Sequence, residues 1–215
     1  MTTDTLIVGC GIAGAAAALR LAEDRERRIT VVTREHDPAE SNSSWAQGGI
    51  VGRGEDDSAK LLVEDVVSAG DGLTSPAAAE LLAKDGPRLL AELFLEQRDP
   101  GFDRDAADRL AFGLEGAHSR RRILHVGDRT GSAIMVSLLA RLADRPNVEL
   151  LTEHTAVDLV TFPHHARDPL AVYEPLACHG AYVYHAPTRR VEPLIAARTL
   201  RATGGLGELF LNTSN

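Results

Sequence analysis

The sequence predicts an α/β fold with a Rossmann-like nucleotide-binding domain, and three neighbouring segments carry this prediction. An apolar run, residues 6–8, leads into the glycine-rich stretch Gly9-Cys10-Gly11-Ile12-Ala13-Gly14. Residues 15–21 are rich in alanine and leucine, and residues 29–33 form a second apolar run that is typical of a strand. A strand, a glycine turn, a helix and a second strand make up the βαβ unit that binds dinucleotides.

The spacing of the glycines suits a ligand that contains a pyrophosphate. In such a unit, backbone N–H groups and the positive end of the helix face the phosphates. A Cβ atom would obstruct the turn, the ligand or the close contact between helix and strand. A purely structural glycine turn is the alternative, and the flanking strands and helix favour dinucleotide binding over it.

The end of the second predicted strand leaves the identity of the dinucleotide open. An acidic residue commonly binds the ribose hydroxyls about 20 residues after the glycines. Strand alternation places Thr33 at this position, followed by Arg34 and Glu35. Arg34 would suit the 2′-phosphate of NADP, whereas the Thr33 hydroxyl and the backbone would suit the adenosine of FAD. The βαβ unit does not choose between them.

Composition excludes several classes of partner. The chain has 215 residues, 44% of them hydrophobic, which is enough for one domain with a core. The net charge is −8, and the longest basic tract is Arg120–Arg122, so neither nucleic acid nor an anionic membrane is an expected partner. No apolar run reaches the roughly 18 residues of a membrane span, and the start lacks a basic signal region.

The cysteines and histidines indicate neither a disulfide framework nor a metal site. Cys10 and Cys178 lie far apart in the sequence and are expected to be free thiols, which favours the cytoplasm. The eight histidines show no convincing ligand spacing with cysteine or carboxylate residues, so no metal is expected.

The middle of the chain is expected to be helical, with polar loops. Residues 36–56 read as a long polar loop, and loops of this length are usually functional or disordered. Ser58 or Asp57 can begin a helix that ends at Gly70, and Ser75-Pro76 can begin a second one. Gly86-Pro87 is expected to interrupt that second helix. After a polar loop at 99–109, Thr130 or Asp128 can cap a helix over 131–142.

The last third of the chain is expected to form strands. Residues 148–151 and 156–160 have strand-like patterns. Residues 180–185 and 190–195 read as a hairpin, and a further strand over 197–202 runs into Gly204-Gly205.

Four more blocks of sequence carry a resemblance to a known family. They are residues 43–50 (Ser-Ser-Trp-Ala-Gln-Gly-Gly-Ile), 115–125 (Glu-Gly-Ala-His-Ser-Arg-Arg-Arg-Ile-Leu-His), 128–131 (Asp-Arg-Thr-Gly) and 202–205 (Ala-Thr-Gly-Gly). Together, from Thr5 to Asn215, they resemble the L-aspartate oxidases, within the succinate dehydrogenase/fumarate reductase flavoprotein group. The resemblance implies FAD as the cofactor.

The resemblance and the glycine loop together indicate which residues bind FAD. They are Gly9, Cys10, Gly11, Ile12, Ala13, Gly14, Thr33, Arg34, Asn42, Ser43, Ser44, Trp45, Ala46, Gln47, Gly48, Gly49, Thr155, Ala156, Thr203, Gly204 and Gly205. Trp45 either packs against the flavin or fills core. Succinate dehydrogenases have a histidine five residues before the glutamine, covalently bonded to flavin. This chain has Asn42 there, so we expect non-covalent FAD.

The block around Glu115 implies L-aspartate as the substrate. In the family this glutamate orients the substrate, and a carboxylate can pair with an α-ammonium group that succinate lacks. A solvated carboxylate near Arg120–Arg122 is the alternative reading of Glu115. His118 and His125 in the same block are either structural supports or lie close to the substrate.

The resemblance also implies a reaction and its partners. L-aspartate gives up a hydride to FAD and becomes iminoaspartate, and oxygen or fumarate then reoxidises the flavin. This is the first step of de novo NAD synthesis, in which quinolinate synthase uses the imine.

Family members continue well beyond the position of Asn215, through a capping domain that carries substrate-binding arginine and histidine residues. We therefore expect residues 1–215 to be the N-terminal part of an FAD-binding domain, lacking the capping domain and the closing FAD-domain segment and inactive alone. The alternatives are a non-catalytic FAD-binding remnant and a soluble fumarate reductase-like flavoenzyme, and the Glu115 block argues against the latter.

Overall fold

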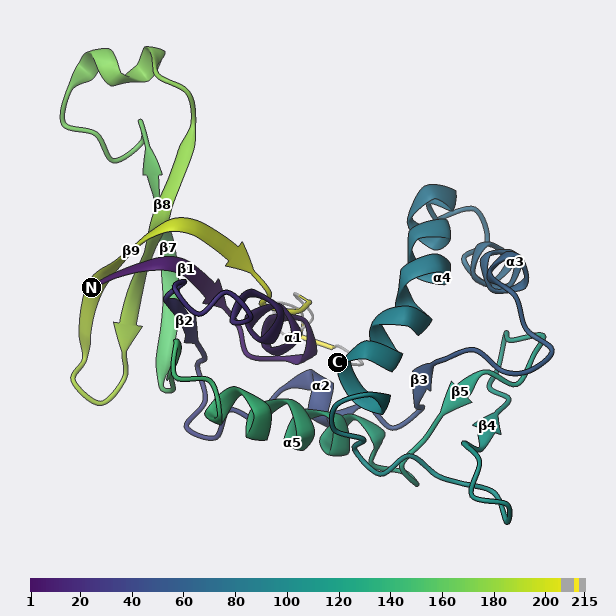
Figure 1. Ribbon diagram of the computed structural model, residues 1–215. Coiled ribbons are helices and arrows are strands. Elements are labelled where there is room, and N and C mark those ends of the chain that lie inside the picture. Colours follow the sequence, from purple (N-terminus) through teal and green to yellow (C-terminus); the bar gives the residue numbers. More distant parts are fainter. Residues whose placement is uncertain (206–210, 213–215) are drawn as a thin grey trace. The chain divides into compact units, whose positions relative to one another are not determined.

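A computed structural model of the chain describes residues 1–205 and 211–212 (Figure 1). Its contacts divide the chain into two compact units. Met1–Ser43 and Leu138–Asn215 form the first unit, and Ser44–Ser137 form the second. That residues 1–215 make up a single FAD-binding domain stays a prediction.

The first unit is built on a mixed six-stranded sheet in the order β6-β2-β1-β9-β8-β7. Its strands are β1 (Thr2–Val8), β2 (Ile29–Val32), β6 (Val148–Leu151), β7 (His154–Phe162), β8 (Ala177–His185) and β9 (Arg190–Arg201). β1 runs parallel to β2 and β9, and β2 runs parallel to β6. β7, β8 and β9 form an antiparallel meander. The predicted α/β class is confirmed.

The βαβ unit lies at the centre of this sheet. Leu6, Ile7 and Val31 are completely buried, as expected for parallel strands whose two faces are both covered. α1 (Ile12–Leu21) connects β1 to β2 and buries Ala15 and Ala18. Small alanine side chains let the helix approach the sheet closely, which explains the alanine-rich sequence after the glycines.

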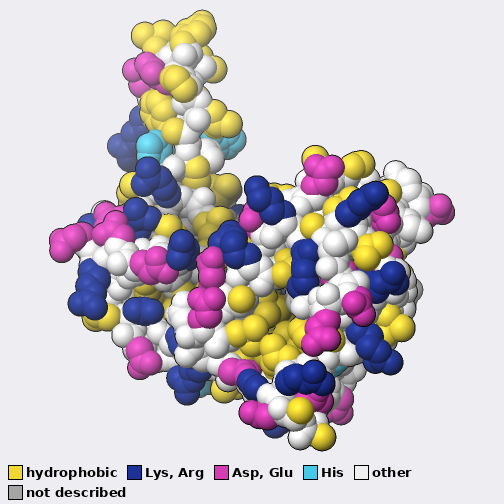
Figure 2. Space-filling model, turned by 45° about the vertical axis from the view of Figure 1, so that its right-hand side comes forward, with side chains coloured by type: hydrophobic (Ala, Val, Ile, Leu, Met, Phe, Trp, Pro, Cys, Tyr) yellow, Lys and Arg dark blue, Asp and Glu magenta, His cyan; other side chains and the backbone are white. Residues whose placement is uncertain are grey.

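The meander extends beyond the body of the sheet as a projecting arm. β7 and β8 form it, and a short 3₁₀ turn, Pro169–Tyr173, lies in the connection between them (Figure 1). Leu170, Val172 and Tyr173 in this connection are largely exposed, and Figure 2 shows apolar side chains gathered at the end of the projection. The arm is therefore apolar at its tip.

The predicted hairpin is confirmed, but the predicted break after residue 195 is wrong. β9 is one continuous strand over Arg190–Arg201. Its first half pairs with β8 and its second half with β1, and Ile195 pairs with both. Because every part of β9 has a hydrogen-bonding neighbour, nothing separates the two expected strands.

The second unit is mainly helical. Its elements include β3 (Ile50–Val51), α3 (Ala59–Ala69), α4 (Pro76–Leu90), a π-helical turn (Ala91–Leu95), β4 (Phe112–Gly113) and β5 (Ile123–Leu124). The borders of the second unit fall within α2 (Asn42–Trp45) and α5 (Thr130–Ala143). The three short strands form an antiparallel sheet in the order β3-β5-β4. The predicted polar loop over 36–56 thus contains α2 and β3.

Two predicted helix caps are present. The Ser58 hydroxyl accepts a hydrogen bond from Leu61 N at 3.3 Å, and the Ser75 hydroxyl accepts one from Ala78 N at 3.4 Å. Each satisfies an amide that has no acceptor within its helix.

The predicted interruption at Gly86-Pro87 is wrong, because α4 continues through both residues. Proline lacks the N–H that would bond the carbonyl of Ala83, four residues earlier. Arg53 Nη2 donates a 2.7 Å hydrogen bond to that carbonyl oxygen instead. A residue far away in sequence thus supplies the donor that proline removes, and the helix does not have to end.

Candidate functional site

A cavity opens at the carboxyl ends of β1, β2 and β9 in the first unit, with a volume of about 760 Å³. Its lining includes these residues expected to bind a dinucleotide: Gly9, Cys10, Gly11, Ile12, Ala13, Thr33, Arg34, Asn42, Ser43, Thr155, Ala156, Thr203, Gly204 and Gly205. Ligands of open α/β sheets bind at this edge of the sheet. The volume lies within the usual range for cofactor sites.

The glycine loop is where β1, α1 and the chain after β9 come closest together. Gly9 has φ +104°, and a Cβ there would lie 2.3 Å from the carbonyl oxygen of Ala202. A Cβ on Gly14 would lie 2.0 Å from the carbonyl oxygen of Gly9. Gly14 does not line the cavity. Its contribution is to allow this packing.

The start of α1 faces the cavity through Gly11, Ile12 and Ala13. The amide of Ile12 donates a 3.1 Å hydrogen bond to the Ser43 hydroxyl. A Cβ added to Gly11 would meet that hydroxyl oxygen at 3.0 Å. Helix N-termini attract phosphate because their first amides lack helical acceptors, so this end of the cavity suits the pyrophosphate of a dinucleotide.

Burial raises the pKa of the Cys10 thiol to about 11. The thiol is therefore neutral at physiological pH and adds no negative charge beside a bound phosphate.

An ion pair that was not predicted from the sequence lies just after the end of β2. Arg34 Nε donates to Glu35 Oε1 at 2.6 Å, and both residues line the cavity. Glu35 lies close to the 20-residue spacing of a ribose-binding acid, and this spacing could have identified it. Thr33 precedes the pair, and its amide bonds to the carbonyl of Leu151 at 2.9 Å.

Other residues that line the cavity were also missed, and the most informative is Arg201. The other polar ones are Glu40, Ser41 and His154. Arg201 ends β9 in register with Val8, the residue directly before the glycine loop. No sequence motif identifies it, because this register depends on the pairing of β9 with β1. It brings a cation to the edge of the sheet where the phosphates of a dinucleotide are expected.

In the second unit, two of the sequence blocks come together at the start of α5. The carbonyl oxygen of Ala46 accepts a 2.9 Å hydrogen bond from the amide of Gly131. Ser44 lies in α2, and Gln47 and Gly48 follow it on the surface. Trp45 is 77% exposed, so the expectation that it might fill core is wrong.

Gly49 is packed against the block that contains Glu115. It has φ +92°, and a Cβ there would lie 2.4 Å from Ile123 Cγ2 and 2.9 Å from His125 Cε1. A Cβ on Gly113 would lie 2.5 Å from His125 Nε2. The imidazole of His125 therefore depends on two glycines for its space.

Glu115 lies beside this imidazole. Its Oε1 atom is 3.6 Å from His125 Nε2, and its side chain is 47% exposed. Glu115 is half-exposed, as the solvated alternative expects, but the side chain that it contacts is His125 and not one of the tract Arg120–Arg122. The structure thus brings Gly49, His125 and Glu115 together from two separate sequence blocks.

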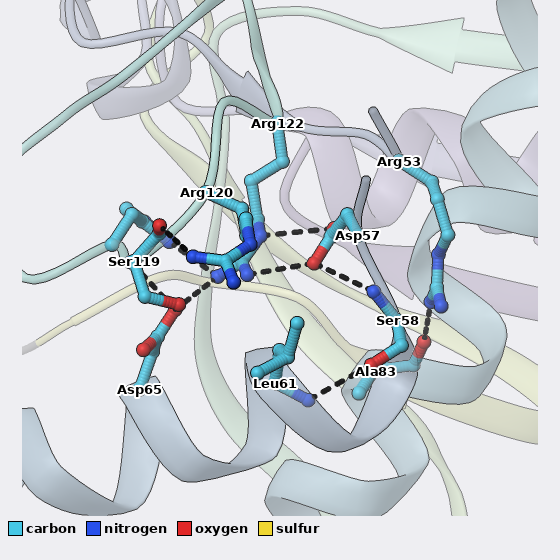
Figure 3. A network of polar contacts seen from close by, with 10 residues as sticks. Arg53, Asp57, Ser58, Leu61, Asp65, Ala83, Ser119, Arg120 and Arg122 are labelled. Carbon is cyan, nitrogen blue, oxygen red and sulfur yellow. Dashed lines mark hydrogen bonds and ion pairs between the residues drawn. The ribbon is translucent and has the colours of Figure 1, made fainter. Parts of the chain in front are cut away.

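A buried ion network lies at the base of the loop that connects β4 to β5 and carries Glu115 (Figure 3). Arg122 is completely buried, with Asp57 and Asp65 as its carboxylate partners. Burial alone would lower the pKa of the arginine, but the hydrogen bonds from Arg122 to the two aspartates raise it, so the guanidinium stays charged. His118 is also in contact with the guanidinium, at 3.0 Å.

No helix in the part of the chain that the structure describes has the length and apolar character to cross a membrane.

Comparisons with known proteins identify the family of the chain. The family described as an FAD binding domain matches residues 4–214. L-aspartate oxidase 1 of Ralstonia nicotianae is 38% identical over 218 residues, which cover 100% of this chain and 39% of that protein. L-aspartate oxidase of Halobacterium salinarum is 33% identical over 219 residues, covering 100% and 40%. The chain thus spans about two fifths of these curated relatives.

Solved structures share the fold. Sdh1 of Mycobacterium smegmatis in complex with UQ1 superposes with a TM-score of 0.86 at 25% identity, covering 100% of this chain and 36% of that one. The E. coli quinol fumarate reductase chain FrdA gives 0.86 at 22% identity, covering 98% and 34%. The cofactor left open by the βαβ unit is therefore FAD. The chain belongs to the FAD-binding domain family, and its curated relatives are L-aspartate oxidases.

Proposed function

We propose that the complete gene product carrying residues 1–215 oxidises L-aspartate to iminoaspartate with FAD. The observation that carries this proposal is the position of Glu115. It is half-exposed beside His125, in a block whose sequence resembles that of the L-aspartate oxidases. A carboxylate held in this way suits the α-ammonium of an amino acid.

FAD fits the cavity of the first unit. We assign the pyrophosphate to the N-terminus of α1 and to Arg201, and the adenosine end to Thr33, Arg34 and Glu35. The flavin accepts a hydride from the substrate's α-carbon. Asn42 lines the cavity, and its amide offers no ring nitrogen for a covalent bond to flavin, so non-covalent FAD is part of the proposal.

The remaining assignments follow the resemblance. We assign Ser44, Trp45, Ala46, Gln47, Gly48 and Gly49 to the flavin. Gly49 supports this assignment indirectly, because it packs against the His125 ring beside Glu115.

Several finer points belong to the same proposal. Oxygen or fumarate reoxidises the flavin, and the reaction is the first step of NAD synthesis, with the imine passing to quinolinate synthase. Residues 1–215 are inactive alone, because they correspond to only about two fifths of the relatives. Location in the cytoplasm stays a prediction.

A soluble fumarate reductase-like enzyme is the second candidate, and the likeness to FrdA favours it. The two candidates differ in their need for an amine. Hydrogen peroxide release in air should be measured with L-aspartate, D-aspartate and succinate, and fumarate reduction should be measured without oxygen, using the complete gene product saturated with FAD. Peroxide from L-aspartate alone supports the proposal. Fumarate reduction without any oxidation of L-aspartate supports the second candidate.

A further inference from the structure

The loop that carries Glu115 connects β4 to β5 and is tied at several points. At its base, the amide of Arg122 donates to the carbonyl oxygen of Gly113 at 3.1 Å. The carbonyl oxygen of Glu115 itself accepts a 3.2 Å hydrogen bond from the amide of His118. At its tip, the amide and the hydroxyl of Ser119 both donate to Asp65 Oδ2 at 2.9 Å.

One arginine, Arg122, binds both Asp57 and Asp65. Arg122 Nε and Nη2 bond the two carboxylate oxygens of Asp57 at 3.0 and 2.7 Å, and Nη1 bonds Asp65 Oδ2 (Figure 3). The side chains of Asp57 and Asp65 are 1% and 14% exposed. A planar guanidinium holds such partners in a fixed geometry. Asp65 on α3 therefore anchors both the base and the tip of the loop.

The same guanidinium also contacts His118. Arg122 Nη1 lies 3.0 Å from His118 Nδ1, and a guanidinium can only donate hydrogen bonds. Arg122 is therefore the donor in this contact, which ties a side chain of the loop to the arginine as well as the loop backbone.

We propose that Asp65 and Arg122 are positioning residues for Glu115. They hold the loop so that the Glu115 carboxylate stays beside His125 and is already in place when an α-ammonium group arrives. Preorganised charges recognise a ligand better because no ordering is required at the moment of binding. This inference rests on the role proposed above for Glu115.

The test compares Asp65→Asn, Glu115→Gln and the double variant in the complete holoenzyme. The measured quantity is the ratio of kcat/KM for L-aspartate oxidation to kcat/KM for fumarate reduction, because fumarate has no amine. Asp65→Asn keeps an acceptor for Ser119 but loses the charge that holds Arg122. We expect Asp65→Asn to lower the ratio about fivefold to tenfold. In the double variant it should lower the ratio no further than Glu115→Gln alone does, because the effects of residues that act together are not additive.

Asp99→Asn is the matched control. Asp99 also accepts two backbone amides and pairs with an arginine, Arg104, but it lies outside this loop. Asp99→Asn should leave the ratio of the two kcat/KM values unchanged. This result would exclude a general loss of stability as the cause of the change in Asp65→Asn.

Each other outcome has a distinct meaning. If Glu115→Gln lowers the ratio and Asp65→Asn does not, the positioning role is overturned while the substrate role of Glu115 stands. The positioning role is also overturned if Asp65→Asn lowers kcat/KM by the same factor for both reactions, and if this loss adds to that of Glu115→Gln in the double variant. Such a result indicates a merely structural residue. If Glu115→Gln leaves the ratio unchanged, the proposed role of Glu115 fails, and the positioning role fails with it.

Discussion

Glu115 and His125 lie side by side, with 3.6 Å between Oε1 of the glutamate and Nε2 of the imidazole. The imidazole occupies space that exists only because residues 49 and 113 are glycines. The carboxylate therefore has a defined neighbour on one side and remains half-exposed on the other. This arrangement can receive a cationic group from solvent without first breaking a close ion pair.

Replacing Glu115 by Gln should affect L-aspartate much more than fumarate. Loss of one charge-assisted hydrogen bond should cost about 1.5–3 kcal/mol, or roughly 10- to 150-fold in kcat/KM for aspartate oxidation. Steady-state kinetics of the complete gene product would measure this loss. Glu55→Gln is the control, because the Glu55 side chain is 89% exposed and should not affect the reaction. Equal losses for both substrates would show that Glu115 has no role in recognising the amine.

Replacing Asp57 by Ala should destabilise the second unit strongly. It leaves the completely buried guanidinium of Arg122 without its bidentate partner, and breaking a buried pair from one side costs about 3–5 kcal/mol. Urea unfolding of the complete gene product would measure the change. The exposed neighbour Asp56→Ala should change the stability by less than about 0.5 kcal/mol. A similar small change for Asp57→Ala would contradict the buried network.

Replacing Arg53 by Met should weaken α4 at its proline. The change leaves the Ala83 carbonyl without its 2.7 Å donor, at a cost of about 1–3 kcal/mol. In a Pro87→Ala background the helix supplies its own N–H, so the same change should cost much less. The comparison of the four proteins by urea unfolding isolates the coupling. Equal costs in both backgrounds would show that Arg53 does not compensate for the proline.

Replacing Gly11 by Val should remove FAD from a protein that still folds. The new side chain starts 3.0 Å from the Ser43 hydroxyl and extends into the cavity where the pyrophosphate is expected. Gly86→Ala is the control, because its Cβ has 4.0 Å of space in α4 and it lies outside the cavity. Retained flavin can be measured after gel filtration of the complete gene product. Unchanged retention in Gly11→Val would place the phosphates elsewhere.

The sequence predicted the parts of the molecule that depend on local residues. The glycine loop, the apolar strands around it and the serine caps at Ser58 and Ser75 follow from short-range chemistry, and the structure contains each of them. Local patterns also suggested a stop at Pro87, which failed because the donor from Arg53 comes from another part of the chain.

The missing parts of the candidate site depend on tertiary pairing. Arg201 reaches the cavity through the register of β9 against β1, which no single segment encodes. The meeting of Gly49 with His125 likewise depends on the small sheet that pairs β3 with β5. The resemblance identified Glu115 but not the buried Asp65 and Arg122 beneath it, because charged residues in a sequence are usually exposed.

According to the proposed function, the complete gene product transfers reducing equivalents from L-aspartate to non-covalently bound FAD. The most direct measurement is bleaching of the flavin absorbance by one equivalent of L-aspartate without oxygen, followed by acid precipitation. We expect that L-aspartate bleaches the flavin, that D-aspartate and succinate do not, and that the flavin is released into the supernatant. A bound flavin that dithionite reduces but L-aspartate does not, or a flavin that remains in the pellet, would contradict it.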